Sequence, residues 1–137
     1  MFNYPRTIET RLATMTMVEA GLLLQRFREN VRIDLPGFQE NKEARFTLSG
    51  DEPCAMLSVF PREIDFDVRI TSSDHFAPER GKETLTALAV VAQDSMVEMV
   101  SRLYFSYFPQ VFNARVFNNE QSALNWLRQF VPEAAQR

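Results

Sequence analysis

The segment 85–131 constrains the fold of this chain more than any other part of its sequence. It begins with a nearly unbroken apolar run, 85–92, of the length and composition of a strand that is covered on both faces. An amphipathic aromatic stretch follows to about Phe108, and then a short apolar run at 114–117 leads into a second amphipathic stretch. The order strand, helix, strand, helix predicts a parallel α/β layer.

The first third of the chain predicts a hairpin followed by a helix. The Thr-rich segment 8–18 alternates imperfectly, which favours a strand with a bulge, and a short turn joins it to a second strand at 22–27. Asp34 is the predicted N-cap of the first helix, and Gly50 is its predicted left-handed stop.

The middle of the chain contains one clear strand and one ambiguous segment. Residues 54–60 are nearly all apolar and predict a third strand, which Pro61 ends. In the segment 62–81, apolar residues alternate with acids, so we expect a loop or an edge strand whose acids face water. A short helix is expected somewhere in 74–84.

The predicted helix 95–108 has an apolar stripe that should face the core. At about 100° per residue, the stripe contains Met96, Met99, Val100, Leu103 and Tyr107. Phe105 falls instead on the polar side, near Glu98, where an aromatic ring has no obvious packing role. In the final helix, the predicted cap is Asn118, which forms a capping-box pattern with Gln121.

These elements predict one α/β domain over residues 1–137. Its mixed, mostly parallel sheet has about five strands, including the N-terminal antiparallel hairpin, and about four helices. A chain of 137 residues is long enough to bury a core without metal or disulfide support.

Composition excludes several classes of function. The net charge of −3 and the absence of a basic block argue against nucleic-acid binding, and no apolar run approaches the roughly 20 residues of a stable membrane span. The single cysteine, Cys54, fits a reducing compartment, and the N-terminus lacks a signal-peptide pattern, so we expect a cytoplasmic protein.

The sequence carries no recognisable catalytic or metal-binding pattern. His75 is the only histidine, and the four glycines form no nucleotide-binding loop. Cys54 and His75 are a conceivable nucleophilic pair, but a cysteine that begins an apolar strand is more commonly an inert buried thiol. Acids between 63 and 74 could serve acid–base chemistry, yet their alternation is typical of the wet side of a strand. We predict neither catalysis, nor a cofactor, nor a metal.

The chain resembles the STAS-like domains, which are related to anti-sigma-factor antagonists, and specifically a small bacterial group of unknown function described only as STAS-like or CRAL-TRIO-like. The resemblance is carried by the Ala-Leu-Ala-Val-Val run at 87–91, the helix from Ser95 to Pro109, and the segment 116–127. Weaker support comes from 21–23 and 33–48. The resemblance implies a non-enzymatic module that binds a partner protein.

In the wider family, the resemblance also implies a switch in which a serine at the start of the helix after the third strand is phosphorylated. This chain lacks the Asp-Ser-Ser-Gly-like signature of that switch. Ser72 and Ser73 lie nearest the equivalent place and are therefore the candidate positions, because a phosphate at a helix start would meet N–H groups and the helix dipole.

Two hypotheses about function follow. The first is a regulatory or protein-interaction module, expected to be a homodimer, with Tyr104, Phe105 and Phe108 as the possible interface. The second is a small-molecule or lipid-binding domain with an apolar cavity lined by Phe and Met; the 12 Phe of the chain leave aromatic area for either role. The partner or ligand is not identified by the sequence.

Overall fold

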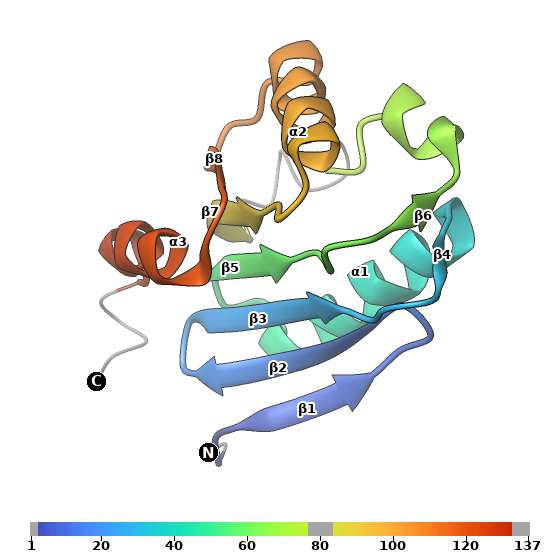
Figure 1. The fold of residues 1–137 in the computed structure, drawn as a ribbon. Coiled ribbons are helices and arrows are strands. Elements are labelled where there is room, and N and C mark those ends of the chain that lie inside the picture. Colours follow the sequence, from blue (N-terminus) through green and yellow to red (C-terminus); the bar gives the residue numbers. More distant parts are fainter. Residues whose placement is uncertain (1–2, 77–83, 133–137) are drawn as a thin grey trace.

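A computed structural model describes residues 3–76 and 84–132 of the chain. Its centre is a six-stranded sheet in the order β1-β2-β3-β5-β7-β8 (Figure 1). The strands are β1 (Arg6–Glu9), β2 (Ala13–Glu19), β3 (Leu22–Phe27), β5 (Cys54–Val59), β7 (Leu85–Val91) and β8 (Asn113–Phe117). The first three strands are antiparallel, whereas β3, β5, β7 and β8 run parallel. The predicted mixed, mostly parallel sheet is confirmed.

Helices cover both faces of this sheet. They are α1 (Leu35–Ser49), α2 (Ser95–Tyr107) and α3 (Glu120–Leu127), with the 3-10 helices η1 (Val68–Ser72) and η3 (Arg128–Phe130). One face packs against α1 and α2, and the other against α3. A separate pair of two-residue strands, β4 (Arg32–Ile33) and β6 (Asp65–Phe66), lies beyond β3 and β5.

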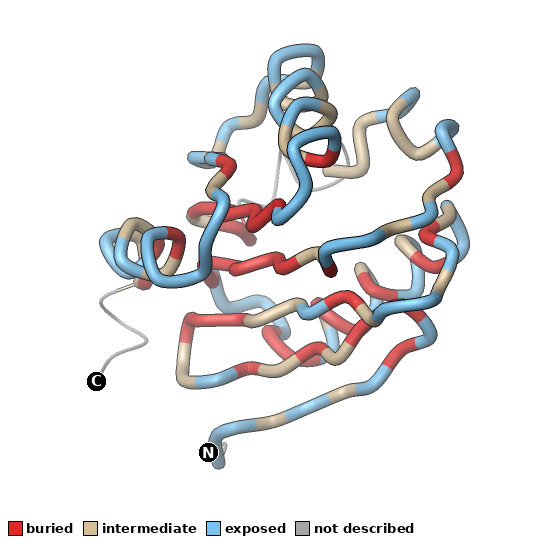
Figure 2. Tube along the Cα trace, in the orientation of Figure 1, coloured by how far each residue is buried: buried red, intermediate tan, exposed pale blue. Residues whose placement is uncertain are grey.

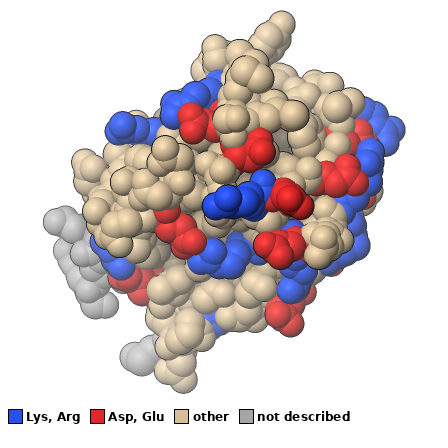
Figure 3. All heavy atoms as spheres, viewed as in Figure 1, with Lys and Arg blue, Asp and Glu red and all other residues tan. Residues whose placement is uncertain are grey.

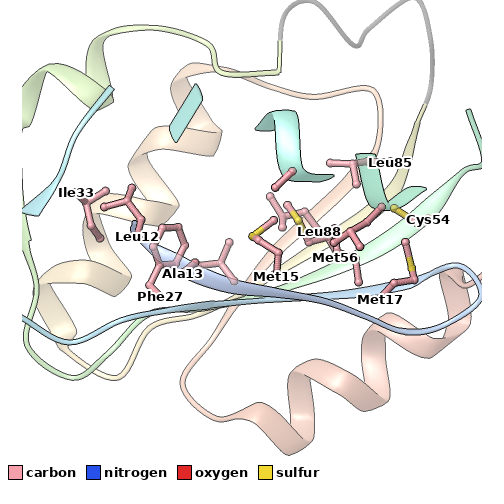
Figure 4. Close-up of a cluster of buried hydrophobic side chains, with 14 of the residues drawn as sticks. Leu12, Ala13, Met15, Met17, Phe27, Ile33, Cys54, Met56, Leu85 and Leu88 are labelled. Carbon is pink, nitrogen blue, oxygen red and sulfur yellow. The ribbon is translucent and has the colours of Figure 1, made fainter. Parts of the chain in front are cut away.

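Each face of the sheet has its own apolar core. The larger core includes Leu12, Met15 and Met56 under α1 and α2, and part of it is drawn in Figure 4. The smaller core joins β5 and β7 to Ala123 and Leu127 of α3. Buried positions therefore run along the strands, as Figure 2 shows, and the continuous burial of β5 and of nearly all of β7 matches their apolar sequences.

Polar caps set the helix ends. The Asp34 carboxylate accepts a hydrogen bond from the backbone N–H of Gly37 at 2.9 Å, and Gly50 ends α1 with φ of 59°, so both predicted boundaries are confirmed. Asp94 caps α2 by accepting from the N–H groups of Met96 and Val97. At α3 the cap is Asn119 rather than the predicted Asn118, because the Asn119 side chain accepts from the N–H of Ser122 at 2.8 Å.

The element count differs slightly from the prediction. The expected first strand at 8–18 is two strands, β1 and β2, because the chain turns back at 10–12, and the predicted bulge occurs as a register shift between Met17 and Glu19. Three α-helices are present in the described part of the chain instead of four. Most of the short helix expected in 74–84 falls outside the described residues. In the described ranges, no helix is long and apolar enough to cross a membrane.

The orientation of α2 contradicts the predicted core stripe. Four apolar residues of α2 are exposed, namely Met96 (58%), Met99 (57%), Leu103 (58%) and Tyr107 (84%), and we call this set the α2 outer stripe. Val97 is the buried residue of α2, and Phe105 packs against the larger core. Because α2 carries apolar side chains on both sides, helical periodicity alone could not indicate which side packs.

Candidate ligand-binding cavity

The site arises at the crossover from β5 to β7, whose described part contains no α-helix to cover the sheet. The chain passes from β5 to β7 on the face that α1 and α2 cover, and the described part of this crossover contains only β6 and η1. The space between α1 and α2 over the carboxyl-terminal halves of β3, β5 and β7 is consequently a cavity of about 510 Å³. The crevice at the carboxyl ends of parallel strands is the usual ligand position in open α/β sheets.

Most of the cavity wall is apolar. The floor of the cavity is the sheet, with Met56, Leu88 and Val90. We call the part of the wall formed by α2 the α2 side, and it includes Val97, Val100 and Phe105. The remaining apolar lining residues are Phe27, Ile33, Leu35, Pro36, Phe38, Phe60, Ile64, Phe66, Ile70 and Phe76. Such a surface favours the apolar part of a ligand.

The polar part of the wall is a chain of hydrogen bonds that joins α1 to the sheet. The Asn41 amide accepts from the Thr10 hydroxyl at 2.5 Å and donates to the Gln25 carbonyl oxygen at 3.1 Å. The Gln25 amide then donates to the Ser58 hydroxyl at 2.9 Å. Gln25 and Ser58 are register partners on β3 and β5, so the parallel pairing brings them together. We call Gln25, Asn41 and Ser58 the polar wall.

Two basic residues of α1 adjoin the polar wall. Arg45 lies one turn beyond Asn41 and is only 3% exposed, with its guanidinium 4.9 Å from the Phe46 ring centroid. Lys42 also lines the cavity, whereas no Asp or Glu occurs among its lining residues in the described ranges. By contrast, on the molecular face in Figure 3 acidic and basic side chains are interspersed.

His75 closes the cavity between the two helices. Its ring contacts Phe38 of α1 edge-on, with centroids 4.8 Å apart, and stacks with Tyr104 of α2 at 5.8 Å. Its Nε2 lies 2.5 Å from the Ile70 carbonyl oxygen, which can only accept, so Nε2 carries the proton. Burial, opposed by this hydrogen bond, lowers the pKa of His75. The imidazole is therefore neutral at pH 7.

A capped 3-10 turn holds the segment that carries His75. Asp67 precedes η1, and its carboxylate accepts from the backbone N–H and the side chain of Arg69. These hydrogen bonds lower the pKa of Asp67 to about 2. The prediction that the acids in this region face water is wrong for Asp67, which is buried, but holds for the exposed Asp65.

The three predicted interface residues form one aromatic cluster on α2, but only two of them line the cavity. Tyr104 and Phe105 line the cavity, and the Tyr104 hydroxyl donates to the Ser73 carbonyl oxygen at 2.8 Å. Phe108 is half-buried at the end of α2, with its ring centroid 5.1 Å from that of Tyr104. The placement of Phe105 on the polar side is therefore corrected, while any role of these rings in association stays a prediction.

The remaining predicted candidates lie in separate places. Ser72 ends η1 and Ser73 follows it, so these exposed serines are at the end of a helix and not at its start. The expected binding of a phosphate by helix N–H groups does not apply there, and phosphorylation stays a prediction. Cys54 is buried at the start of β5, while His75 lies near the opposite, carboxyl end of that strand.

Sequence reasoning missed the polar wall, although the signal was present. Ser58 interrupts an otherwise apolar strand that is buried throughout, and Gln25 interrupts another. On α1, the polar residues Asn41 and Arg45 occupy the same inward face as Phe38 and Leu48, at helical spacing. A buried polar residue is costly unless it is hydrogen-bonded, so such interruptions indicate a polar network. No set of three His, Cys, Asp or Glu in the described ranges is placed to hold a metal ion.

The fold and family follow from comparison with known proteins. The chain is similar to an uncharacterized DUF3478-family protein with a SpoIIAA-like fold from Shewanella loihica PV-4, seen in a crystal structure, with a TM-score of 0.52, 15% sequence identity and coverage of 90% of this chain and 91% of that chain. This likeness confirms the STAS-like fold. The model of a family described as a domain of unknown function, DUF7793, matches residues 16–131, and the chain belongs to that family. No curated protein matches the chain.

Proposed function

We propose that this protein binds a small, largely apolar molecule in the cavity between α1 and α2 and that it is not an enzyme. The observation that carries the proposal is the cavity itself. Its volume of about 510 Å³ falls within the roughly 300–1,000 Å³ of typical ligand pockets, and its wall combines aromatic and aliphatic side chains with a few convergent polar groups.

The chemistry of the wall supports binding without catalysis. His75 is the residue whose ordinary pKa lies nearest to neutral pH, but its imidazole donates Nε2–H to the Ile70 carbonyl. The Tyr104 hydroxyl accepts from the backbone N–H of His75 and not from its ring. Ser58 accepts from Gln25 and is not paired with a base in the described ranges. A hydroxyl without an adjacent base is a weak nucleophile, so Ser58 is better suited to hydrogen-bond a ligand.

A cavity-filling substitution tests this proposal. Val100 is half-buried on the α2 side of the cavity, and Val100→Trp should occupy space that a ligand needs. We expect native mass spectrometry of the purified protein to show a bound molecule, or a fluorescent apolar probe to bind, in the natural chain but at least tenfold more weakly in Val100→Trp. Val111→Trp, at a 66% exposed position outside the cavity lining, is the matched control.

The proposal fails if neither method detects binding to the natural chain, or if the two tryptophan variants bind the probe equally well. Circular dichroism of both variants verifies that each remains folded.

A second candidate function rests on a different surface. We propose that the α2 outer stripe mediates association, most simply as a homodimer. Four neighbouring large side chains with exposures of 57–84% on one helix form a patch that favours a protein contact. The substitution Leu103→Glu should shift a concentration-dependent dimer to monomer in sedimentation velocity. Val68→Glu is the control, because Val68 is 70% exposed and lies on η1. A monomeric natural chain would remove this candidate.

A further inference from the structure

We infer that the ligand of the cavity is an amphipathic monocarboxylate, whose carboxylate is held by the polar wall and whose apolar body lies against the α2 side. This inference rests on the proposed ligand-binding function and specifies its chemistry.

The polar wall has hydrogen-bond donors to spare but few acceptors. Within the network, the Asn41 oxygen accepts from Thr10 and the Gln25 oxygen accepts from Asn41. Each of these two amides uses one of its two N–H bonds. The Asn41 amide donates to Gln25, and the Gln25 amide donates to Ser58. The Ser58 hydroxyl thereby receives a hydrogen bond and retains its own proton for donation.

These remaining donors define the complementary group on a ligand. In the described ranges, no acceptor pairs with the Ser58 proton or with the second N–H group of Gln25 and of Asn41. Buried donors are costly when they stay unsatisfied, so a bound molecule should place an acceptor among them. A carboxylate provides acceptors only, with about four lone-pair sites, which matches this wall better than a hydroxyl or an amine.

Charge favours the same group. Lys42 and the buried Arg45 lie on α1 beside the polar wall, and no carboxylate from the described ranges lines the cavity. His75 is neutral and contributes no charge, so Lys42 gives this part of the cavity a positive charge. Hydrogen bonds to an ionised acceptor are roughly twice as strong as neutral ones, and a cationic ligand would be repelled.

The apolar side of the cavity indicates the chemistry of the rest of the ligand. Opposite the polar wall, α2 presents mainly Val97, Val100 and Phe105, with Ser101 as its small polar residue. Polar groups are thus concentrated on α1, β3 and β5, and a ligand with one charged end and an apolar body satisfies both sides. A dianionic head would require removing more charge from water than a single carboxylate, which favours a monoanion.

The experiment compares head groups on one chain. Isothermal titration calorimetry would measure the binding of dodecanoate, dodecanol and dodecylamine to the full chain. Each compound is used below the concentration at which it aggregates in water. We expect dodecanoate to bind at least about tenfold more tightly than dodecanol, because charge-assisted hydrogen bonds contribute more than neutral ones. Dodecylamine should bind more weakly than either.

Variants then locate the carboxylate. Lys42→Gln and Ser58→Ala should each weaken dodecanoate binding by roughly fivefold to tenfold while changing dodecanol binding less than twofold. Arg128→Gln removes a basic charge that pairs with Glu19 and lies outside the cavity, so it should leave dodecanoate binding unchanged. Lys42 is only half-buried, so Lys42→Gln is expected to fold even if a polar-wall variant does not.

The outcomes separate this inference from the proposed function. If dodecanol binds as tightly as dodecanoate and Lys42→Gln has no selective effect, the cavity binds apolar molecules but the carboxylate assignment is wrong. If none of the three compounds binds and no apolar probe binds either, the proposed function itself fails.

Discussion

At the scale of single residues, Gly37 shows how closely the start of α1 packs against the strands. A Cβ atom at this position would lie 2.5 Å from Cγ of Leu12, a side chain with 0% exposure. Because Leu12 has no solvent into which it can move, the helix start must shift to accept a larger residue.

We therefore predict that Gly37→Ala destabilises the protein. Alanine is the better helix former by about 1 kcal/mol, but overpacking a core costs typically about 1–3 kcal/mol, and the steric cost should win. Urea denaturation should show a lower unfolding midpoint. Gln39→Ala, at an exposed position on the same helix, is the control and should change the unfolding free energy by less than about 0.5 kcal/mol.

His75 predicts a pH dependence of stability. Because burial lowers its pKa in the folded protein, the unfolded chain binds a proton near pH 6.5 while the folded chain does not. Stability is thus fully present above about pH 6.5 and falls as the pH drops below it. Asp34 and Asp67 do not contribute in this range, since their folded pKa values are lowered and they remain ionised above pH 5.

The measurement is urea unfolding at pH 7.5 and pH 5.5 for the natural chain and for His75→Phe. The natural chain should lose more stability on acidification than the variant, because phenylalanine retains the ring contacts with Phe38 and Tyr104 but cannot titrate. Equal losses in both proteins would contradict the prediction.

At the scale of elements, the stability of α2 depends on its N-cap, Asp94. Its buried anchor is Val97, and the Asp94 carboxylate accepts hydrogen bonds from two N–H groups in the first turn. We predict that Asp94→Ala lowers the unfolding free energy by about 1 kcal/mol, within the range of about 0.5–2 kcal/mol for lost N-caps. Thermal unfolding measures it, and Asp51→Ala, an exposed position that caps no helix, should leave the midpoint nearly unchanged.

The elements also show how far sequence reasoning extends. Apolar runs located β5 and β7 because strands covered on both faces need continuous apolar sequence. Asp34 and Gly50 marked the ends of α1 because backbone groups there require local partners. The inward face of α2 was not predictable in the same way, since Met99 and Phe105 are equally apolar and only tertiary packing distinguishes their sides.

At the scale of the whole molecule, the cavity depends on topology. Its wall combines residues from the strands β3, β4, β5 and β7, the helices α1 and α2, and the β5–β7 crossover, which lie far apart in sequence. The polar interruptions at Gln25, Asn41 and Ser58 were visible in the sequence, but their convergence required the register of β3 with β5 and the position of α1. The existence of a gap between α1 and α2 had no local signal.

Ligand binding should therefore stabilise the whole fold. A molecule that binds only the folded chain adds about 2.7 kcal/mol to the unfolding free energy at a concentration 100 times its Kd. We predict a corresponding rise in Tm for the natural chain with dodecanoate in scanning calorimetry, and a much smaller rise for Val100→Trp. Equal rises in the two proteins would place the binding site outside the cavity.

The exposure of the α2 outer stripe has a chemical consequence. Met96 and Met99 are open to solvent, whereas Met15, Met17 and Met56 are buried, as is the Cys54 thiol. Mild peroxide should convert the two exposed thioethers to sulfoxides before it reaches the buried sulfur atoms. Oxidation would make one face of a single helix polar without any change of sequence, so the redox state of the surroundings can itself alter what that face contacts.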